Sequence, residues 1–237
     1  MKCAIVDERI SSLCEQALIR LGFSVIKLPP SKKLPAPMAS HADMLLFSNE
    51  KRIIASAEYF HDNRDVFSDI RRLSPNTEIH LSSDSFGNKY PHDRIFNSLV
   101  IENDIFMKTE GISESVIEYA NEKGLNIVNV NQGYPACTAL AFGGSAITSD
   151  EGMAKALTEK GVRVTLISNG DISLPPYEYG FIGGAAGVYK KEIFFLGNVT
   201  RHRDYEKIDA AIRYEGYTYI SLSDEGLSDL GKIIFLD

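Results

Sequence analysis

Cys137-Thr-Ala-Leu-Ala-Phe142 is a short apolar strand, and Gly143-Gly144 after it supplies the positive φ angles of a hairpin turn. Ala146-Ile-Thr148 returns as a second strand. Asp150 is a good N-cap for a helix from Glu151 to Lys160, and the following glycine fits the left-handed position that ends a helix. Val162 to Ile167 then alternates as a third strand. The stretch therefore predicts strand, tight turn, strand, helix and strand.

The same order of elements recurs along the whole chain. The centres of the predicted second strands are Ala4, Ile53, Ile105, Ile147 and Ile193, which are separated by 49, 52, 42 and 46 residues. One fifth of the 237-residue chain is about 47 residues. A regular period of this size indicates repeated supersecondary units that share one core.

Four copies are continuous in the sequence, and the fifth is divided between the two ends of the chain. The N-terminus offers a second strand (Lys2 to Val6), a helix (Ser11 to Leu21) and a third strand (Phe23 to Leu28), but no first strand. The C-terminus offers one lone strand, Gly231 to Leu236. We expect these ends to pair, because closure removes sheet edges that would otherwise promote aggregation. The predicted fold is a five-unit α/β propeller, formed by residues 1–237 as a single domain.

Composition agrees with a compact protein and excludes several classes. Of the 237 residues, 44% are hydrophobic, and no run of 18 apolar residues is present to span a membrane. A net charge of −7 disfavours binding to nucleic acid or to an anionic membrane. Three cysteines, an odd number, argue against a disulfide framework and favour a reducing, cytoplasmic location. The N-terminus has no apolar stretch long enough for a signal peptide.

Two motifs lie at matching places in the repeat. His41-Ala-Asp43-Met-Leu-Leu-Phe47 opens one predicted first strand, and Cys137 opens another, 137 − 41 = 96 residues later, or two periods. Asp229-Leu-Gly-Lys-Ile-Ile234 stands before the C-terminal strand, one unit before the histidine around the ring. The first strand of each unit would lie nearest the axis of a closed ring. We therefore expect His41, Cys137 and Asp229 to meet at one channel mouth.

Together, the repeat and these motifs resemble the pentein superfamily of guanidino-group-modifying enzymes. Gln132-Gly-Tyr-Pro-Ala-Cys-Thr138 and Tyr179-Gly-Phe-Ile-Gly-Gly-Ala-Ala-Gly187 are similar to a bacterial branch of this fold that has no assigned reaction. The resemblance implies a nucleophilic cysteine at Cys137, a general acid and base at His41, and a carboxylate grip on a guanidinium from Asp43 and Asp229. The reaction would be hydrolysis or group transfer through a covalent thiouronium intermediate, on a cationic small molecule. An imidazolium at His41 would lower the pKa of the Cys137 thiol, and the bound cation would add to this effect.

The chain departs from the superfamily in two respects. The superfamily's cysteine is usually near the C-terminus, whereas Cys137 is in the middle, so the chain would be a circular permutation. The superfamily's Glu-Gly-Gly-Asp motif is replaced by Asp229-Leu-Gly-Lys232. The superfamily also includes a non-catalytic ribosome anti-association factor, which keeps open an inactive binding protein as the alternative function. A purely structural repeat domain that contacts another protein is a third interpretation.

The residues also allow structural interpretations. A free cysteine that leads an apolar strand is often a packing residue, and a His-x-Asp in a polar loop is often simply solvated. Asp43, two residues after the histidine, would share its face of a strand. Gln132, Tyr134 and Arg94 are expected at the channel mouth. Cys/His spacing predicts no metal site, and the glycine-rich stretch before residue 187 leads into a strand rather than a helix, so no cofactor is predicted.

Three connections between units are longer than the rest. They span 29–40, 82–93 and 169–180, and each follows a third strand and precedes a first strand. Long loops on a rigid scaffold are where binding specificity usually resides. We therefore expect all three to gather on one face, over the same mouth.

Overall fold

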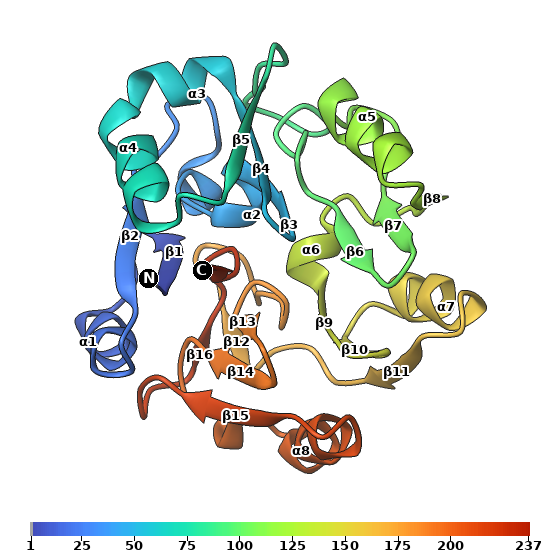
Figure 1. Ribbon diagram of the computed structural model, residues 1–237. Helices are drawn as coiled ribbons and strands as arrows, with labels where there is room; N and C mark the ends of the chain where they lie inside the picture. Colours follow the sequence, from blue (N-terminus) through green and yellow to red (C-terminus); the bar gives the residue numbers. More distant parts are fainter. Residues whose placement is uncertain (1) are drawn as a thin grey trace.

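The computed structural model describes residues 2–237, and within these residues five three-stranded sheets have the same internal order (Figure 1). In each sheet the central strand pairs antiparallel with the first strand and parallel with the third. The sheets are β17–β1–β2 (Ile234–Leu236, Cys3–Asp7, Ser24–Leu28), β3–β4–β5 (Leu46–Asn49, Arg52–Ser56, Glu78–Ser82), β6–β7–β8 (Leu99–Ile101, Asp104–Met107, Asn126–Asn129), β9–β10–β11 (Ala139–Phe142, Ser145–Thr148, Arg163–Leu166) and β13–β14–β15 (Ala186–Tyr189, Glu192–Phe195, Thr218–Ser221).

The helices between the second and third strands of these sheets lie on the outside of the molecule (Figure 1). They are α1 (Ser12–Arg20), α3 (Ala57–Asp62), α4 (Arg64–Leu73), α5 (Glu114–Glu122), α7 (Glu151–Glu159) and α8 (Tyr205–Tyr214). Two one-turn helices, α2 (Ala42–Leu45) and α6 (Pro135–Thr138), instead precede the first strands β3 and β9. Single 3₁₀ turns cover Ala36–Met38 and Val199–Arg201. None of the helices in residues 2–237 has the length and apolar character needed to cross a membrane.

The local signals of the sheet β9–β10–β11 act as the sequence predicts, with one difference in the turn. Gly143 adopts a φ of +54° between β9 and β10, whereas Gly144, expected to share this conformation, does not have a positive φ. The side chain of Asp150 caps α7 by accepting a hydrogen bond of 2.7 Å from the backbone N–H of Met153. Gly161, with a φ of +82°, follows the end of α7 and turns the chain into β11. Local turn and cap residues thus fix the boundaries of this unit.

The two ends of the described chain meet in one sheet. Strand β17 pairs antiparallel with β1, with Cys3 opposite Leu236 and Ile5 opposite Ile234. Strand β2 pairs parallel with β1 on the other side. The pairing expected between the C-terminal and N-terminal strands is therefore present, and it gives this sheet the same order as the other four.

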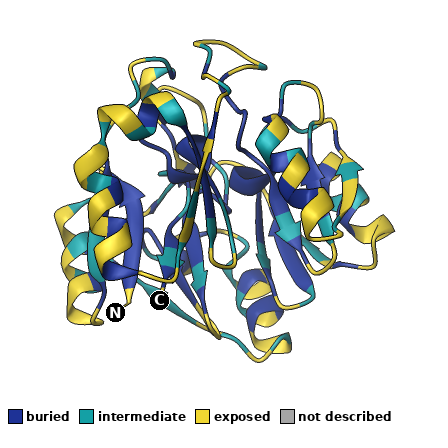
Figure 2. Ribbon diagram, turned by 45° about the horizontal axis from the view of Figure 1, so that its top comes forward, coloured by how far each residue is buried: buried dark blue, intermediate teal, exposed yellow. Residues whose placement is uncertain are grey.

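Side chains on the inner faces of the helices and on the strands form the core. Figure 2 shows buried residues along the strands and exposed residues on the outward faces of the helices. Helix α7 illustrates the pattern, because Met153 and Leu157, one turn apart, are both fully buried. Each sheet is therefore covered by an amphipathic helix.

The structure differs from the sequence predictions at two first strands. Asp43 and Cys137, expected on strands, lie on the one-turn helices α2 and α6, and the strands β3 and β9 begin only at Leu46 and Ala139. His41 and Asp43 consequently do not share a face of a strand, because His41 is the N-cap residue of α2. Four-residue helices leave no periodic pattern in a sequence, so they were read as extensions of the apolar strands that follow.

Two further elements were not expected. Helix α3 precedes α4 in the connection between β4 and β5. A small parallel sheet joins β12 (Ile172–Ser173) to β16 (Leu227–Ser228), on either side of the last complete unit. This sheet holds the loop after residue 173 close to Asp229, whose backbone N–H donates to the carbonyl of Ser173 at 2.9 Å.

Candidate active site

Cys137, Asp43 and His41 meet in a buried cluster, although 96 residues separate the cysteine from the histidine. The Cys137 thiol donates a hydrogen bond of 2.7 Å to Oδ2 of Asp43. The cysteine sulfur, one carboxylate oxygen of Asp43 and one ring nitrogen of His41 all lie within 4.8 Å of one another. The three side chains are 4%, 4% and 1% exposed, respectively. Two one-turn helices from different units therefore bring a thiol, a carboxyl and an imidazole together.

The glycine-rich stretch before β13 holds the Cys137 turn in place. Gly184 donates its backbone N–H to the carbonyl of Cys137 at 2.9 Å. A Cβ atom on Gly183 would lie 2.5 to 2.6 Å from the carbonyl oxygens of Ala136, Cys137 and Ala139. Only glycine permits this approach, so Gly183 serves close backbone packing against the Cys137 turn.

Asn97 supports both helices and was missed by the sequence analysis. Its amide nitrogen lies 3.4 Å from the sulfur of Cys137 and 3.3 Å from the backbone oxygen of Asp43, and its amide oxygen accepts from the N–H of Ala136 at 2.9 Å. Asn97 is fully buried two residues before β6, just as Cys137 stands two residues before β9. The repeat itself was the signal that could have found it.

Asp7, at the end of β1, is the carboxylate beside the histidine, and it too was missed. Its Oδ2 lies 3.8 Å from Nε2 of His41, and both side chains are essentially inaccessible to solvent. Arg9 holds Asp7 through Nε and Nη2, and its Nη2 also donates to the carbonyl of Pro37 at 2.8 Å. Asp7 is thus positioned to stabilise a protonated His41, while Arg9 competes for the same carboxylate.

Asp229 occupies a fitted position in the same region. Its carboxylate accepts hydrogen bonds from the backbone N–H groups of Phe181, at 2.9 Å, and Gly231, at 3.1 Å. A Cβ on Gly184 would lie 1.9 Å from Oδ1 of Asp229, so a glycine is required beside it. The side chain is 1% exposed. Asp229 therefore lies in the same region as His41 and Cys137, and backbone donors hold its carboxylate.

Burial sets the protonation states in this cluster. Burial, and secondly the nearby carboxylate of Asp43, raises the pKa of the Cys137 thiol well above its ordinary value. Burial lowers the pKa of His41 to about 4, against a smaller opposing effect of Asp7. Burial raises the pKa of Asp43 to about 6 and, with the charge of Asp43, the pKa of Asp229 to about 7. At neutral pH the thiol and the imidazole are therefore both uncharged.

This state corrects one sequence expectation. An imidazolium next to Cys137 was expected to lower the pKa of its thiol, but the neighbouring hydrogen-bond acceptor is the carboxylate of Asp43, and His41 is neutral near pH 7. Both ring nitrogens of His41 lack a hydrogen-bond partner within the described residues. An unpartnered buried imidazole leaves room for a group that is brought in by a ligand.

A cavity of about 420 Å³ opens onto Cys137. Its polar lining residues are His41, Gln132, Cys137, Glu178 and Asp229. The apolar and aromatic lining residues are Met38, Tyr134, Leu174, Tyr177, Tyr179 and Phe181. Two of the three long connections contribute to this lining, and the connection over 82–93 does not. The expectation that all three connections cover one mouth is therefore correct for two of them.

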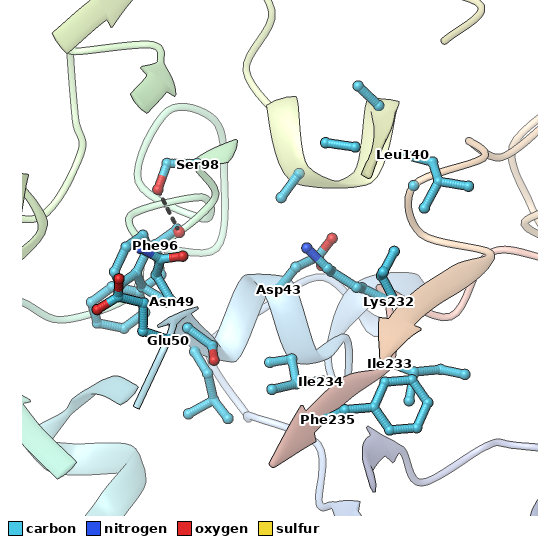
Figure 3. A pocket seen from close by; sticks show the side chains of 18 residues that line it. Asp43, Asn49, Glu50, Phe96, Ser98, Leu140, Lys232, Ile233, Ile234 and Phe235 are labelled. Carbon is cyan, nitrogen blue, oxygen red and sulfur yellow. Dashed lines mark hydrogen bonds between the residues drawn. The ribbon is translucent and has the colours of Figure 1, made fainter. Parts of the chain in front are cut away.

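A second cavity, of about 190 Å³, lies against Asp43 and is lined by strand residues of several units (Figure 3). Lys232 extends toward Asp43 in this cavity (Figure 3). Its ammonium interacts electrostatically with Asp43 and with Cys137. Burial lowers the pKa of Lys232, and the negative charge of Asp43 is the larger of the effects that oppose this. Because Asp43 lines this cavity and Cys137 lines the other, the hydrogen bond between them links the two cavities.

The remaining predicted residues differ in their placement. Gln132 lines the cavity at Cys137, but its amide nitrogen donates to Oδ2 of Asp150 at 2.7 Å. Arg94 is fully buried outside the cavity lining. Its guanidinium donates to the backbone oxygens of Lys108 and Glu110 and lies 4.7 Å from the ring centroid of Tyr90. The structure therefore brings Gln132 to the mouth and assigns Arg94 to packing beneath the loops.

The cluster also contains ligand types that bind metals, which the spacing in the sequence did not reveal. A thiolate, an imidazole and a carboxylate are all zinc ligands, and their atoms lie within 4.8 Å of one another. The thiol already donates its proton to Asp43, so a metal would have to displace that proton. Within residues 2–237, these three side chains form the group with suitable metal-binding geometry.

A substitution at Gly231 shows how tightly the backbone packs around His41. A Cβ on Gly231 would lie 2.2 Å from the Cβ of His41, whereas a Cβ on Gly216 would have no atom within 4 Å. The two glycines have φ angles of +68° and +69°, so alanine causes similar backbone strain at either position. We expect Gly231→Ala to lose about 1 to 3 kcal/mol more unfolding free energy than Gly216→Ala, as measured by chemical denaturation. Equal losses would mean that the Gly231 turn shifts freely.

The model of a protein family matches residues 5–234, which is nearly the whole chain. The chain belongs to DUF6873, a family of unknown function. No curated protein matches the sequence of this DUF6873 member.

Solved structures resemble this DUF6873 member over almost its full length at low sequence identity. Dimethylarginine dimethylaminohydrolase from Pseudomonas aeruginosa, solved as a cysteine-to-serine mutant with citrulline, is 12% identical with a TM-score of 0.56, over 94% of this chain and 91% of that chain. An amidinotransferase of the saxitoxin pathway from Microseira wollei is 9% identical with a TM-score of 0.54, over 96% and 88% of the two chains.

A third structure, an arginine dihydrolase of the cyanobacterial ornithine–ammonia cycle, is 11% identical with a TM-score of 0.51, and the match covers 95% of this chain and 36% of that chain. The three neighbours are members of the pentein superfamily, which confirms the resemblance predicted from the sequence. At these identities the likeness establishes the fold, a mixed α/β arrangement of small sheets.

Proposed function

We propose that this protein is a cysteine-dependent hydrolase or group transferase for a guanidino or amidino cation, built as a closed five-unit α/β propeller in a single domain. The observation that carries the proposal is the contact between the Cys137 thiol and Asp43 at the end of a cavity, with His41 within 4.8 Å. A guanidinium resists attack because its charge is delocalised. Its hydrolysis requires a strong nucleophile, carboxylates that hold the planar cation, and a group that transfers protons.

Because the thiol is neutral in the free protein, the first step requires that the substrate promotes its ionisation. A guanidinium that donates N–H groups to Asp43 and Asp229 brings a positive charge beside the sulfur, and this charge stabilises the thiolate. The proton released by Cys137 passes to His41, where Asp7, 3.8 Å away, stabilises the imidazolium. The buried carboxyls thus serve as the grip, and binding of the cation itself activates the nucleophile.

The bond changes then balance as follows. The thiolate of Cys137 attacks the central carbon, a C–S bond forms, and one C–N π pair moves onto nitrogen. The leaving amine takes a proton from His41 as its C–N bond breaks, which leaves a thiouronium on the sulfur. Water, or an acceptor amine in a transferase, loses a proton to His41 and attacks the same carbon. The C–S bond breaks and the thiolate is restored.

One experiment tests this proposal directly. The purified protein is incubated with arginine, agmatine, methylated arginines and simple amidines between pH 6 and 9.5, and released ammonia, amine and urea-type products are measured. We expect at least one compound to be turned over, and intact mass spectrometry of quenched reactions to show a covalent adduct on Cys137. Absence of both product and adduct across the panel would contradict the proposal.

The alternative is a catalytically inactive protein that uses the same cavity only for binding. A specific observation favours it: the thiol is 4% exposed with a raised pKa, and the pKa of His41 is lowered to about 4, so neither group is charged in the free protein. An inactive site would bind a cation from the same panel without product or adduct. The two functions are therefore separated by the same measurement.

Replacing Asp43 with asparagine should separate thiol reactivity from turnover. Removal of the carboxylate lowers the pKa of the Cys137 thiol, because its negative charge helps to keep that pKa high. We expect the rate of Cys137 alkylation at pH 8 to rise about tenfold, because a larger fraction of the thiol is then ionised. Turnover should nevertheless fall at least about a hundredfold, because the guanidinium loses one of the two carboxylates that hold it.

Alkylation at each cysteine is measured by peptide mass spectrometry, which distinguishes Cys137 from Cys3 and Cys14. The control is Asp65→Asn, an exposed carboxylate on α4 that should leave both rates unchanged. An unchanged rate of Cys137 alkylation in Asp43→Asn would mean that burial alone governs the pKa of the thiol.

A further inference from the structure

The walls of the cavity at Cys137 are chiefly aromatic. Tyr134, Tyr177, Tyr179 and Phe181 line it, and the rings of Tyr179 and Phe181 meet edge to face with centroids 6.0 Å apart. Aromatic faces attract cations and pack against alkyl chains. This part of the cavity therefore suits the tail of a cationic molecule whose head reaches Cys137.

The loop that carries three of these wall residues is held at both ends. Strand β12 pairs with β16 before it, Tyr177 donates its backbone N–H to the carbonyl of Leu174 at 2.8 Å, and Gly180 donates to the carbonyl of Ile172 at 2.7 Å. Glu178 lies at the tip of this loop, is exposed, and lines the cavity. A carboxylate therefore stands at the rim, beyond the aromatic walls.

Positive charge is absent from the lining. Among the described residues that line this cavity there is no lysine or arginine, while Asp229 and Glu178 are both acidic. Arg9, which influences the pKa of His41, is engaged with Asp7 and with the carbonyl of Pro37. A substrate carboxylate would consequently enter without a counter-ion and opposite like charges, which is strongly unfavourable.

From this lining we infer that the substrate has a guanidino or amidino cation at one end and a tail without a carboxylate. The far end of the tail, which faces Glu178, carries a second cation or a polar group. The inference rests on the proposed function for the orientation of the head toward Cys137. It assigns Glu178 and the aromatic walls as specificity-determining residues, and it excludes α-amino acids such as arginine as good substrates. Selection against the carboxylate follows from charge repulsion rather than from shape.

Arginine and agmatine provide the test, because they differ only in the carboxylate. Their binding to the Cys137→Ala protein is measured by isothermal titration calorimetry, and their turnover by the native protein is measured in parallel. We expect the affinity for agmatine, and its turnover, to exceed those for arginine by a ratio of at least about ten. Glu178→Arg should narrow this ratio about fivefold or more, whereas the control Glu118→Arg, an exposed substitution on α5, should leave it unchanged.

The possible results separate the inference from the proposed function. Binding of agmatine over arginine without turnover supports the inference and contradicts catalysis. Turnover with arginine equal to or better than agmatine overturns the inference and leaves catalysis standing. An unchanged ratio in Glu178→Arg removes that residue's role in specificity, and failure of both compounds to bind overturns the inference and the guanidino assignment together.

Discussion

Cys137→Ala is expected to reduce turnover of the guanidino substrate by at least about a thousandfold, because the proposed covalent intermediate forms on this thiol. Its affinity for the same cation should change by less than about threefold, since in the proposal Asp43 and Asp229 hold the cation. The alanine side chain fits the space left by the thiol and removes one hydrogen bond to Asp43. Initial rates and calorimetric titrations of the same two proteins measure the two quantities.

Cys14→Ala is the matched control. Cys14 lies on α1, is also 4% exposed, and does not line the cavity at Cys137. Both substitutions remove one buried thiol, so a general effect of cysteine loss would appear in both. Turnover that survives in Cys137→Ala would refute covalent catalysis by this residue. Loss of binding together with turnover would instead mean that the thiol organises the site.

Most of the fold could be predicted because its signals are local. Gly143 marks a hairpin turn, Asp150 caps a helix, and Gly161 ends it, and each of these residues acts within a few positions of itself in the structure. Repetition of the same signals at a steady period then defined the units. The divided unit was predictable because each end of the chain lacked the strand that the other end offered.

The short helices α2 and α6 could not be predicted from periodicity, because four residues make barely one turn. A local hint did exist for α6, since Pro135 occupies its first position, where proline is favoured. For α2 no comparable residue stands at the start. The carboxyl end of each helix leads directly into an apolar strand. Because the residues of the helix and the first residues of the strand are all buried, the hydrophobic pattern does not mark where the helix ends and the strand begins.

The site was predicted only in part, because its chemistry depends on burial and on contacts between units. His41, Asp43 and Cys137 were found from their positions in the repeat and from resemblance to a known superfamily. Asp7 was missed because it stands at the end of a second strand, where the motif has no counterpart. The raised pKa of the Cys137 thiol follows from the depth of the cluster, which a sequence does not record.

Ile234→Ala is expected to destabilise the protein by about 2 to 5 kcal/mol, a large share of the total stability of a typical domain. Ile234 lies opposite Ile5 in the pairing of β17 with β1 and is 6% exposed. Removal of its buried side chain leaves a cavity between the two ends of the chain. Urea denaturation, followed by circular dichroism, measures the loss.

Ile127→Ala, on the outermost strand β8, is the matched control, because Ile127 is 38% exposed. This substitution should lower the unfolding free energy by less than about 1 kcal/mol. The difference between the two losses of unfolding free energy separates the contribution of the terminal strand pairing from the loss expected for any isoleucine on a strand. Because Gly231 contacts His41 and Lys232 reaches toward Asp43, loosening β17 should also weaken cation binding at the site. Equal destabilisation by the two substitutions would show that the terminal strand adds nothing particular to the fold. The convergence of distant polar groups would then not depend on the pairing of the chain ends.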